Sequence, residues 1–122
     1  MYFAGDTGYG QFIDEISARF KKFDIGLIPI GAYLPRRFMK EAHINPEEAV
    51  KLHQQLNIKH SIAIHHATFQ LTAEAIDAPF HDLQQALKKA NLSSANFTVP
   101  EFGTENLYDT QHKILTAAPS LY

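Results

Sequence analysis

The segment Met1-Tyr2-Phe3-Ala4-Gly5-Asp6-Thr7-Gly8-Tyr9 joins a short apolar stretch to a turn bounded by two glycines. The apolar residues predict a strand, and Asp6 follows directly at its end. Gly5 and Gly8 let the backbone bend without the penalty that a Cβ atom would impose. A turn of this kind can direct a carboxylate oxygen at a hard metal ion. The same pattern is also typical of ordinary turns, so its meaning depends on the rest of the sequence.

The hydrophobic pattern beyond this turn predicts alternating helices and strands. Helices are expected at 10–20, at 46–56 and from Pro79 to about residue 90, with a helical turn at 36–39; strands are expected at 23–30, 58–64 and 97–99. Asn45-Pro46-Glu47-Glu48 indicates a helix start, because Asn45 can cap the helix, Pro46 suits its first position and Glu48 can complete a capping box. The apolar run 25–30 is typical of a strand buried on both faces, and Pro29 fits the end of that strand.

This order of elements predicts an α/β fold in which helices connect parallel strands. Functional groups in such folds gather at one end of the strands. Asp6, the loop after Ile30 and His65 each follow a strand, so we expect them to lie together. Side chains alternate along a strand, so His65 and His66 cannot both face one metal ion. After Gly103 the pattern becomes irregular, and we expect 104–122 to form a loosely packed tail.

Composition narrows the possible functions. The 122 residues suffice for one domain at most, and 11 basic against 13 acidic side chains give a formal charge of −2. This charge provides no basic field for a phosphate backbone, so nucleic acid is not an expected partner. With no cysteine and seven histidines, a metal site must use His, Asp or Glu. We find no secretory or membrane-spanning pattern and expect a cytoplasmic protein, although the opening inside a strand-like segment is typical of a fragment.

Four sequence blocks in this order give the chain a family resemblance. They are Gly5–Tyr9, Ile28–Tyr33 with Pro35–Arg36 and Phe38–Lys40, His43 with Asn45–Val50, and Ile64–His65 with Thr68–Phe69. Through them residues 1–103 resemble the C-terminal half of the metallo-β-lactamase-fold hydrolases. Within that family they resemble most the branch of N-acyl-phosphatidylethanolamine-hydrolysing phospholipase D. The resemblance implies half of a four-layer αββα sandwich, with residues 104–122 as a C-terminal tail.

The same resemblance assigns roles to three side chains. It implies two zinc ions in the complete site, with Asp6 as the bridging and catalytic carboxylate and His65 as a ligand of one zinc. It places His43 beside the substrate phosphate, as a catalytic group or proton donor. Paired divalent ions polarise a phosphoryl group and lower the pKa of a water molecule, which suits hydrolysis of a phosphodiester. Other divalent metals also accept His and Asp ligands.

This chain departs from the family pattern at the edges of the blocks. Leu34 and Arg37 stand where relatives have Glu and Trp, and His66 and Ala67 stand where they have Trp and Gly. These changes flank the expected pocket and leave its substrate open, either a phospholipid or a small phosphodiester. The family motif His-x-His-x-Asp-His is absent from the 122 residues. We therefore expect the isolated chain to be inactive and to need an N-terminal half that carries this motif.

Other interpretations stay open. A half-sandwich with an exposed apolar sheet face predicts a homodimer, and a non-catalytic truncated module that pairs through this face is the alternative function. The family also includes enzymes that act at membrane surfaces, so peripheral membrane association is a further expectation. Arg36 can pair with a substrate phosphate or with Glu41 or Glu47. His53 lies on the inward face of its helix, which favours a packed core histidine over a ligand.

Overall fold

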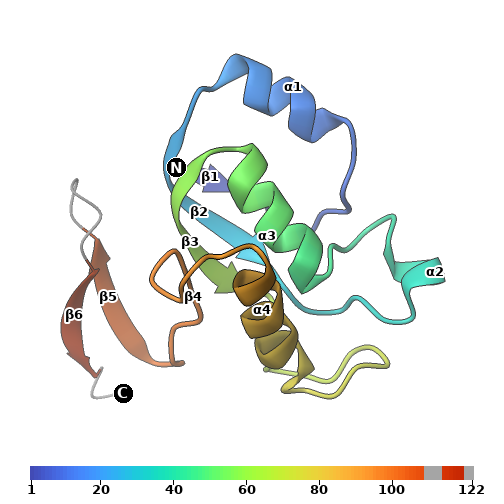
Figure 1. Ribbon diagram of the computed structural model, residues 1–122. Helices are drawn as coiled ribbons and strands as arrows, with labels where there is room; N and C mark the ends of the chain where they lie inside the picture. Colours follow the sequence, from blue (N-terminus) through green and yellow to red (C-terminus); the bar gives the residue numbers. More distant parts are fainter. Residues whose placement is uncertain (109–113, 120–122) are drawn as a thin grey trace.

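A computed structural model describes residues 1–108 and 114–119 (Figure 1). Its main sheet has four strands in the order β1-β2-β3-β4. They are β1 (Tyr2–Phe3), β2 (Phe23–Pro29), β3 (Ile58–Ile64) and β4 (Phe97–Thr98). Each neighbouring pair is parallel. The predicted α/β class with parallel strands is therefore confirmed.

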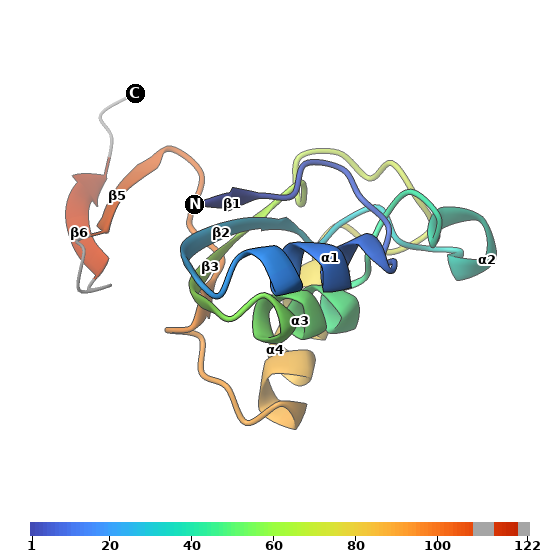
Figure 2. The same cartoon turned by 90° about the horizontal axis from the view of Figure 1, so that it is seen from above.

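Three helices cover a single face of this sheet. Helices α1 (Phe12–Arg19), α3 (Pro46–Gln55) and α4 (Ala78–Lys89) lie on the same side, as Figure 2 shows, and the short α2 (Arg36–Met39) lies in the loop after β2. The core forms between sheet and helices from fully or almost fully buried side chains, among them Ile28, Leu52, Leu56, Ala63, Leu83, Leu87 and Phe97. Burial of this apolar surface drives the docking of the helices.

The start of α3 has the predicted capping box. The backbone N–H of Glu48 donates to Asn45 Oδ1 at 2.8 Å, and the carboxylate of Glu48 accepts from the Asn45 N–H at 3.1 Å. Pro46 occupies the first helical turn, where its missing N–H costs nothing. The sequence pattern at 45–48 is thus confirmed in each of its parts.

The second face of the sheet is partly open. Phe3, Leu27, Ile62 and Thr98 stand in register across the four strands. Phe3 is 63 % exposed, and Leu27 and Ile62 are half-buried. The expectation that β2 is buried on both faces is therefore wrong, because the helices cover the sheet from one side. Pro29 is the last residue of β2, as predicted.

His53 is a core residue of α3, as expected. Its side chain is 4 % exposed, and Nδ1 lies 2.6 Å from the hydroxyl of Ser61 on β3. Burial, together with the smaller effect of the nearby His60 charge, lowers the pKa of His53 to about 4. His53 is accordingly neutral near pH 7 and serves packing.

The segment after Gly103 differs from the expected loose tail. Strands β5 (Thr104–Tyr108) and β6 (Ile114–Pro119) form an antiparallel pair. Side chains along β5 alternate between half-buried and exposed, and the Tyr108 ring lies 4.8 Å from the ring of His60. Paired strands therefore stand where irregular chain was expected, while residues 109–113 and 120–122 lie outside the described part of the chain. Among the described residues, no helix is long and apolar enough to cross a membrane.

Candidate metal centre

Three segments that follow parallel strands meet at one end of the sheet. Asp6 comes after β1, residues 30–35 come after β2, and His65 comes after β3. Because the strands are parallel, their carboxyl ends lie along the same edge. The structure thus brings together the three sites that the sequence predicted to be neighbours.

Two glycines shape the turn that carries Asp6. Gly5 has a φ of 61°, in the left-handed region that glycine adopts without strain. A Cβ atom at Gly8 would meet the backbone oxygen of Glu41 at 2.4 Å. The turn therefore packs directly on the main chain two residues before His43, and a side chain at position 8 would force the two loops apart.

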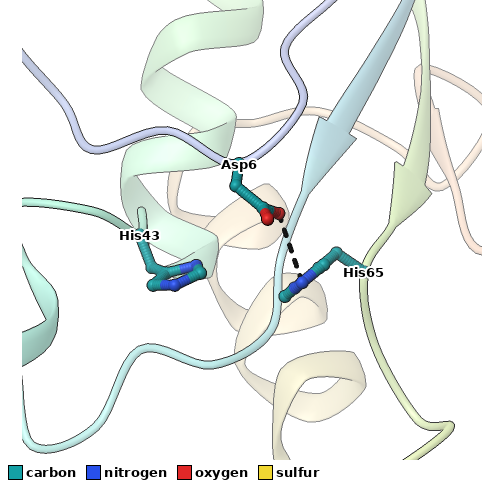
Figure 3. Close-up of side chains that lie close together, drawn as sticks. All are labelled: Asp6, His43 and His65. Atoms are coloured by element: carbon teal, nitrogen blue, oxygen red, sulfur yellow. Dashed lines mark ion pairs between the residues drawn. The ribbon is translucent and has the colours of Figure 1, made fainter.

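His65 leaves the regular alternation of β3. The strand ends at Ile64, and His65 itself has a φ of 57°. Its backbone fits tightly against the loop after β2, because a Cβ atom at Gly31 would meet the His65 oxygen at 2.2 Å. In this conformation His65 Nε2 lies 3.2 Å from Asp6 Oδ1 (Figure 3). Asp6 is 61 % exposed and His65 31 %, so the pair is open to solvent.

His43 approaches the same pair from the loop between α2 and α3. Its ring is stacked on that of His65, with centroids 5.5 Å apart and planes 26° apart. Ligating atoms of Asp6, His43 and His65 all lie within 4.8 Å of one another. Figure 3 shows the three side chains converging from three separate segments. Two imidazoles and a carboxylate at this spacing are a donor set that suits zinc.

One atom of this group lacks a partner. His43 Nδ1 is buried and has no hydrogen-bond partner among the described residues. Buried polar atoms are normally satisfied, so an orphaned imidazole nitrogen indicates a missing ligand, such as a metal ion, a water molecule or a substrate oxygen. The donor set fits a metal ion, for which the sequence predicts Asp6 and His65 as ligands, and the orphaned atom belongs to His43, which the sequence places beside the substrate.

His66 takes a different direction from its neighbour. Its ring stacks on Phe102 at a centroid distance of 5.7 Å. Burial lowers the pKa of His66, a backbone hydrogen bond at Ala63 opposes this change, and the charge of His65 adds to it. The structure therefore directs the two adjacent histidines to different partners, as predicted, although His65 has left the strand and adopts a φ of 57°.

A cavity of about 180 Å³ opens beside His65, and Asp6 and His43 are not among its described lining residues. Its wall includes Gly31, His65, Phe69, Leu71, Glu74 and Ile76. Of the four departures from the family pattern, His66 and Ala67 line this cavity, whereas Leu34 and Arg37 are not among its described lining residues. The guanidinium of Arg37 instead lies over the ring of Phe38, at 4.5 Å from its centroid.

Glu74 is a structural residue of the site that the sequence did not reveal. Its carboxylate is almost fully buried and accepts hydrogen bonds from the backbone N–H groups of Tyr33 and Leu34, at 3.1 and 3.0 Å. Burial alone would raise the pKa of Glu74, but hydrogen bonds from the Thr72 side chain and from backbone N–H groups outweigh it and lower the pKa. Glu74 thus ties the cavity wall to the loop after β2, and no local motif marks such a long-range contact.

Arg36 has a partner other than the expected ones. It forms an ion pair with Glu48, at 2.9 Å to each carboxylate oxygen, rather than with Glu41 or Glu47. Glu48 is held in place by the capping box, so its carboxylate already faces the loop of Arg36. The expected pairing with Glu41 or Glu47 is therefore corrected to Glu48.

Comparisons with known proteins agree with this architecture. An N-acyl-phosphatidylethanolamine-hydrolyzing phospholipase D of Caenorhabditis elegans is 38 % identical over 106 residues, which are 84 % of this chain and 30 % of that protein. A mitochondrial N-acyl-phosphatidylethanolamine-hydrolyzing phospholipase D of Saccharomyces cerevisiae is 31 % identical over 111 residues, 89 % of this chain and 24 % of that protein. An uncharacterized protein of Mycobacterium tuberculosis is 35 % identical over 97 residues, 77 % of this chain and 26 % of that protein.

These alignments cover 24 to 30 % of the relatives' lengths, so the chain corresponds to about a quarter to a third of each protein. A family profile described as the beta-lactamase superfamily domain matches residues 1–66. That match contains Asp6, His43 and His65. By this match over more than half of its residues, the chain belongs to the beta-lactamase superfamily.

Proposed function

We propose that this chain forms the C-terminal part of a zinc-dependent hydrolase that cleaves phosphodiesters, in the manner of a phospholipase D. The observation that carries the proposal is the convergence of Asp6, His43 and His65, whose ligating atoms lie within 4.8 Å of one another. The relatives named for hydrolysis of N-acyl-phosphatidylethanolamine support the substrate class.

Asp6 and His65 are the side chains that would hold the metal. Their nearest ligating atoms are 3.2 Å apart, and both are accessible from solvent. Two divalent ions bound there would polarise the phosphoryl group and make a water molecule more acidic. Asp6 supplies a negative charge for this purpose and His65 a neutral imidazole nitrogen.

His43 would serve the substrate as a hydrogen-bond or proton donor. Its Nδ1 is buried and has no hydrogen-bond partner among the described residues, and a phosphate or leaving-group oxygen that entered beside His65 would supply one. Proton transfer by a positioned side chain typically contributes roughly 10²- to 10⁴-fold to a rate. We therefore assign His43 a catalytic role that is separate from metal binding.

The neighbouring cavity would receive the organic part of the substrate. Its wall combines apolar side chains such as Leu71 and Ile76 with the hydroxyl of Thr68. Phe69 and Leu71 are 74 % and 70 % exposed, so apolar surface continues outward from the cavity. A lipid at a membrane surface could contact the apolar surface both inside and outside the cavity.

The remaining metal ligands would come from an N-terminal half. The 122 residues contain no His-x-His-x-Asp-His motif, and the open sheet face offers the apolar row of Phe3, Leu27 and Ile62 as a packing surface. We propose that the second sheet of the sandwich packs there. The chain by itself would then lack appreciable hydrolase activity.

The test is hydrolysis of N-acyl-phosphatidylethanolamine in mixed micelles by the full-length protein, with phosphatidic acid as the measured product. We expect zinc-dependent turnover. Asp6→Asn should lower kcat/KM by at least about 100-fold. Mutation of residues that merely hydrogen-bond to a metal ligand already lowers activity or metal affinity by about 10- to 100-fold. His43→Gln should lower kcat by roughly 10²-fold or more.

The exposed His81, which pairs with Asp77, provides the matched control, and His81→Gln should leave turnover unchanged. Absence of phosphodiester hydrolysis by the zinc-loaded wild type, or full activity of Asp6→Asn, would contradict the proposal.

The exposure of Phe3 favours a second candidate, a non-catalytic module that pairs through the open sheet face. In that case the native protein in the cell would be the 122-residue chain itself, associated through this face. Its native mass separates the two candidates, because a hydrolase requires a polypeptide well above 13.8 kDa.

A further inference from the structure

One arginine ties the loop of His43 to helix α3. Arg36 Nη1 donates to the backbone carbonyl oxygens of His43, at 2.9 Å, and of Tyr33, at 3.4 Å. Arg36 Nη2 contacts both carboxylate oxygens of Glu48 at 2.9 Å. A single guanidinium thus joins Tyr33, His43 and the first turn of helix α3.

Glu48 is itself held at a fixed place. Its carboxylate accepts from the Asn45 backbone N–H, and its own N–H donates to the Asn45 side chain. Arg36 and Glu48 are only 27 % and 29 % exposed, so solvent screens their interaction less than that of a surface pair. A rigid chain of contacts therefore runs from the α3 cap through Glu48 and Arg36 to the His43 carbonyl.

The ring of His43 depends on such support from its main chain. Nδ1 has no hydrogen-bond partner among the described residues, and the ring contact that fixes it is the stack on His65. Contacts of the His43 main chain consequently decide where the imidazole stands relative to Asp6 and His65. Arg36 supplies the side-chain contact to that main chain, and His43 N–H donates to Met39 at 2.8 Å.

We propose that Arg36 is a positioning residue for His43, with Glu48 orienting its guanidinium. This inference rests on the proposed function and assigns Arg36 a task other than binding the substrate phosphate. Both of its Nη atoms already bond to protein groups. Lysine cannot replace it, because a single ammonium group cannot bridge a carbonyl and both carboxylate oxygens with the fork geometry of a guanidinium.

The kinetic test compares Arg36→Lys with Arg37→Lys in the full-length protein loaded with zinc. The two substitutions are chemically identical, and Arg37 stacks on the exposed Phe38 outside the cavity. Arg36→Lys should lower kcat by about 10- to 100-fold, the effect of a small displacement of a reacting group, with KM and zinc content within about twofold of wild type. Arg37→Lys should stay within about twofold in all three quantities.

A second variant guards against a trivial loss of folding. Glu48→Gln retains an oxygen for the capping box but loses the charge that holds Arg36. It should also lower kcat. The kcat of the double variant Arg36→Lys/Glu48→Gln should be no lower than that of Arg36→Lys, since both substitutions act through one contact. Additive losses in kcat, a rise in KM alone or unchanged kinetics would each overturn the proposal.

An NMR measurement separates this proposal from the proposed function. Histidine labelled with ¹³C at Cε1 gives a signal for His43, assigned through His43→Gln. Arg36→Lys should shift or broaden that signal and leave the signal of the exposed His81 in place. If the wild type hydrolyses no phosphodiester but this shift occurs, the positioning role stands and the hydrolase function falls. An unmoved His43 signal in folded Arg36→Lys contradicts the positioning role whatever the activity.

Discussion

The main chain of His65 occupies the space where a side chain at Gly31 would stand, because a Cβ atom there would meet the His65 oxygen at 2.2 Å. This contact fixes the distance between the loop after β2 and the end of β3. His65 reaches Asp6 from that position, at 3.2 Å. The approach of His65 to Asp6 thus depends on a glycine that carries no chemistry of its own.

Gly31→Ala should therefore destabilise the protein and displace His65. We expect a loss of about 1–3 kcal/mol in the free energy of unfolding, the usual cost of overpacking, because the obstacle is backbone that cannot rotate away. Urea unfolding of the full-length protein measures it. Gly10→Ala is the control, since its Cβ would meet only the Phe12 ring at 3.2 Å. Equal stability of the two variants would contradict the tight contact.

Glu74 should make the cavity wall sensitive to acid. Its pKa is lowered in the folded protein, so its carboxylate contributes stability that is present above the unfolded pKa and is lost as the pH falls through the folded pKa. Glu74→Gln should cost about 1–3 kcal/mol at pH 7, because one N–H of Tyr33 or Leu34 then faces an amide nitrogen.

The unfolding free energy of Glu74→Gln should also vary less with pH below about pH 4.5 than that of the wild type. Urea unfolding between pH 3 and pH 7 measures both effects, with the exposed Glu101→Gln as control. A steeper acid loss in Glu74→Gln than in wild type would contradict this role.

His53 should make the stability of the fold sensitive to pH at higher pH values than Glu74 does. Its pKa falls to about 4 in the folded protein, so between its unfolded pKa near 6.5 and pH 4 the unfolded chain binds a proton that the folded chain does not. Stability should decrease across this window as the pH falls, by roughly 3 kcal/mol at most.

His53→Gln should remove much of this decrease, although it also disturbs the contact with Ser61. Unfolding free energies at pH 7 and pH 4.5 provide the comparison, with the exposed His81→Gln as the matched substitution. Equal losses of unfolding free energy in His53→Gln and His81→Gln between the two pH values would contradict this role of His53.

The open sheet face should make the isolated 122-residue chain associate with itself. Tyr2 packs against the core, so the neighbouring Phe3 points to the opposite face, where it lies in register with Leu27. Phe3→Glu should weaken self-association by at least about tenfold, as expected for an aromatic contact at an interface.

Phe38→Glu is the control, because Phe38 is similarly exposed but lies on α2, away from the sheet. Sedimentation velocity measures both variants. A monodisperse wild-type monomer, or equal effects of the two substitutions, would contradict the proposed packing surface.

Local sequence signals predicted the elements that depend on local physics. Apolar periodicity located β3 at Ile58–Ile64 and α3 after its Asn45 cap, because burial of one face and capping both follow from neighbouring residues. The parallel connection of the strands then placed Asp6 and His65 at one edge. These steps needed no knowledge of distant contacts.

Contacts between distant residues were the part that sequence did not predict. Glu74 accepts hydrogen bonds from backbone N–H groups about 40 residues away. Every residue except proline has such a group, so the residue types do not reveal the contact. Arg36 had several glutamates within reach, and the capping geometry of Glu48 decided among them. The irregular polarity after Gly103 concealed β5, since its stabilisation comes from pairing with β6 rather than from a buried apolar face.

The most direct test of the metal centre compares two adjacent histidines. His65 faces Asp6, whereas His66 stacks on Phe102. The substitutions His65→Ala and His66→Ala remove the same side chain, so they differ in where that side chain points. We would measure the zinc content of the full-length protein by mass spectrometry after equilibrium dialysis. His65→Ala should lose about one equivalent of zinc and His66→Ala should retain the wild-type content. Wild-type zinc content in His65→Ala would contradict the proposed metal centre.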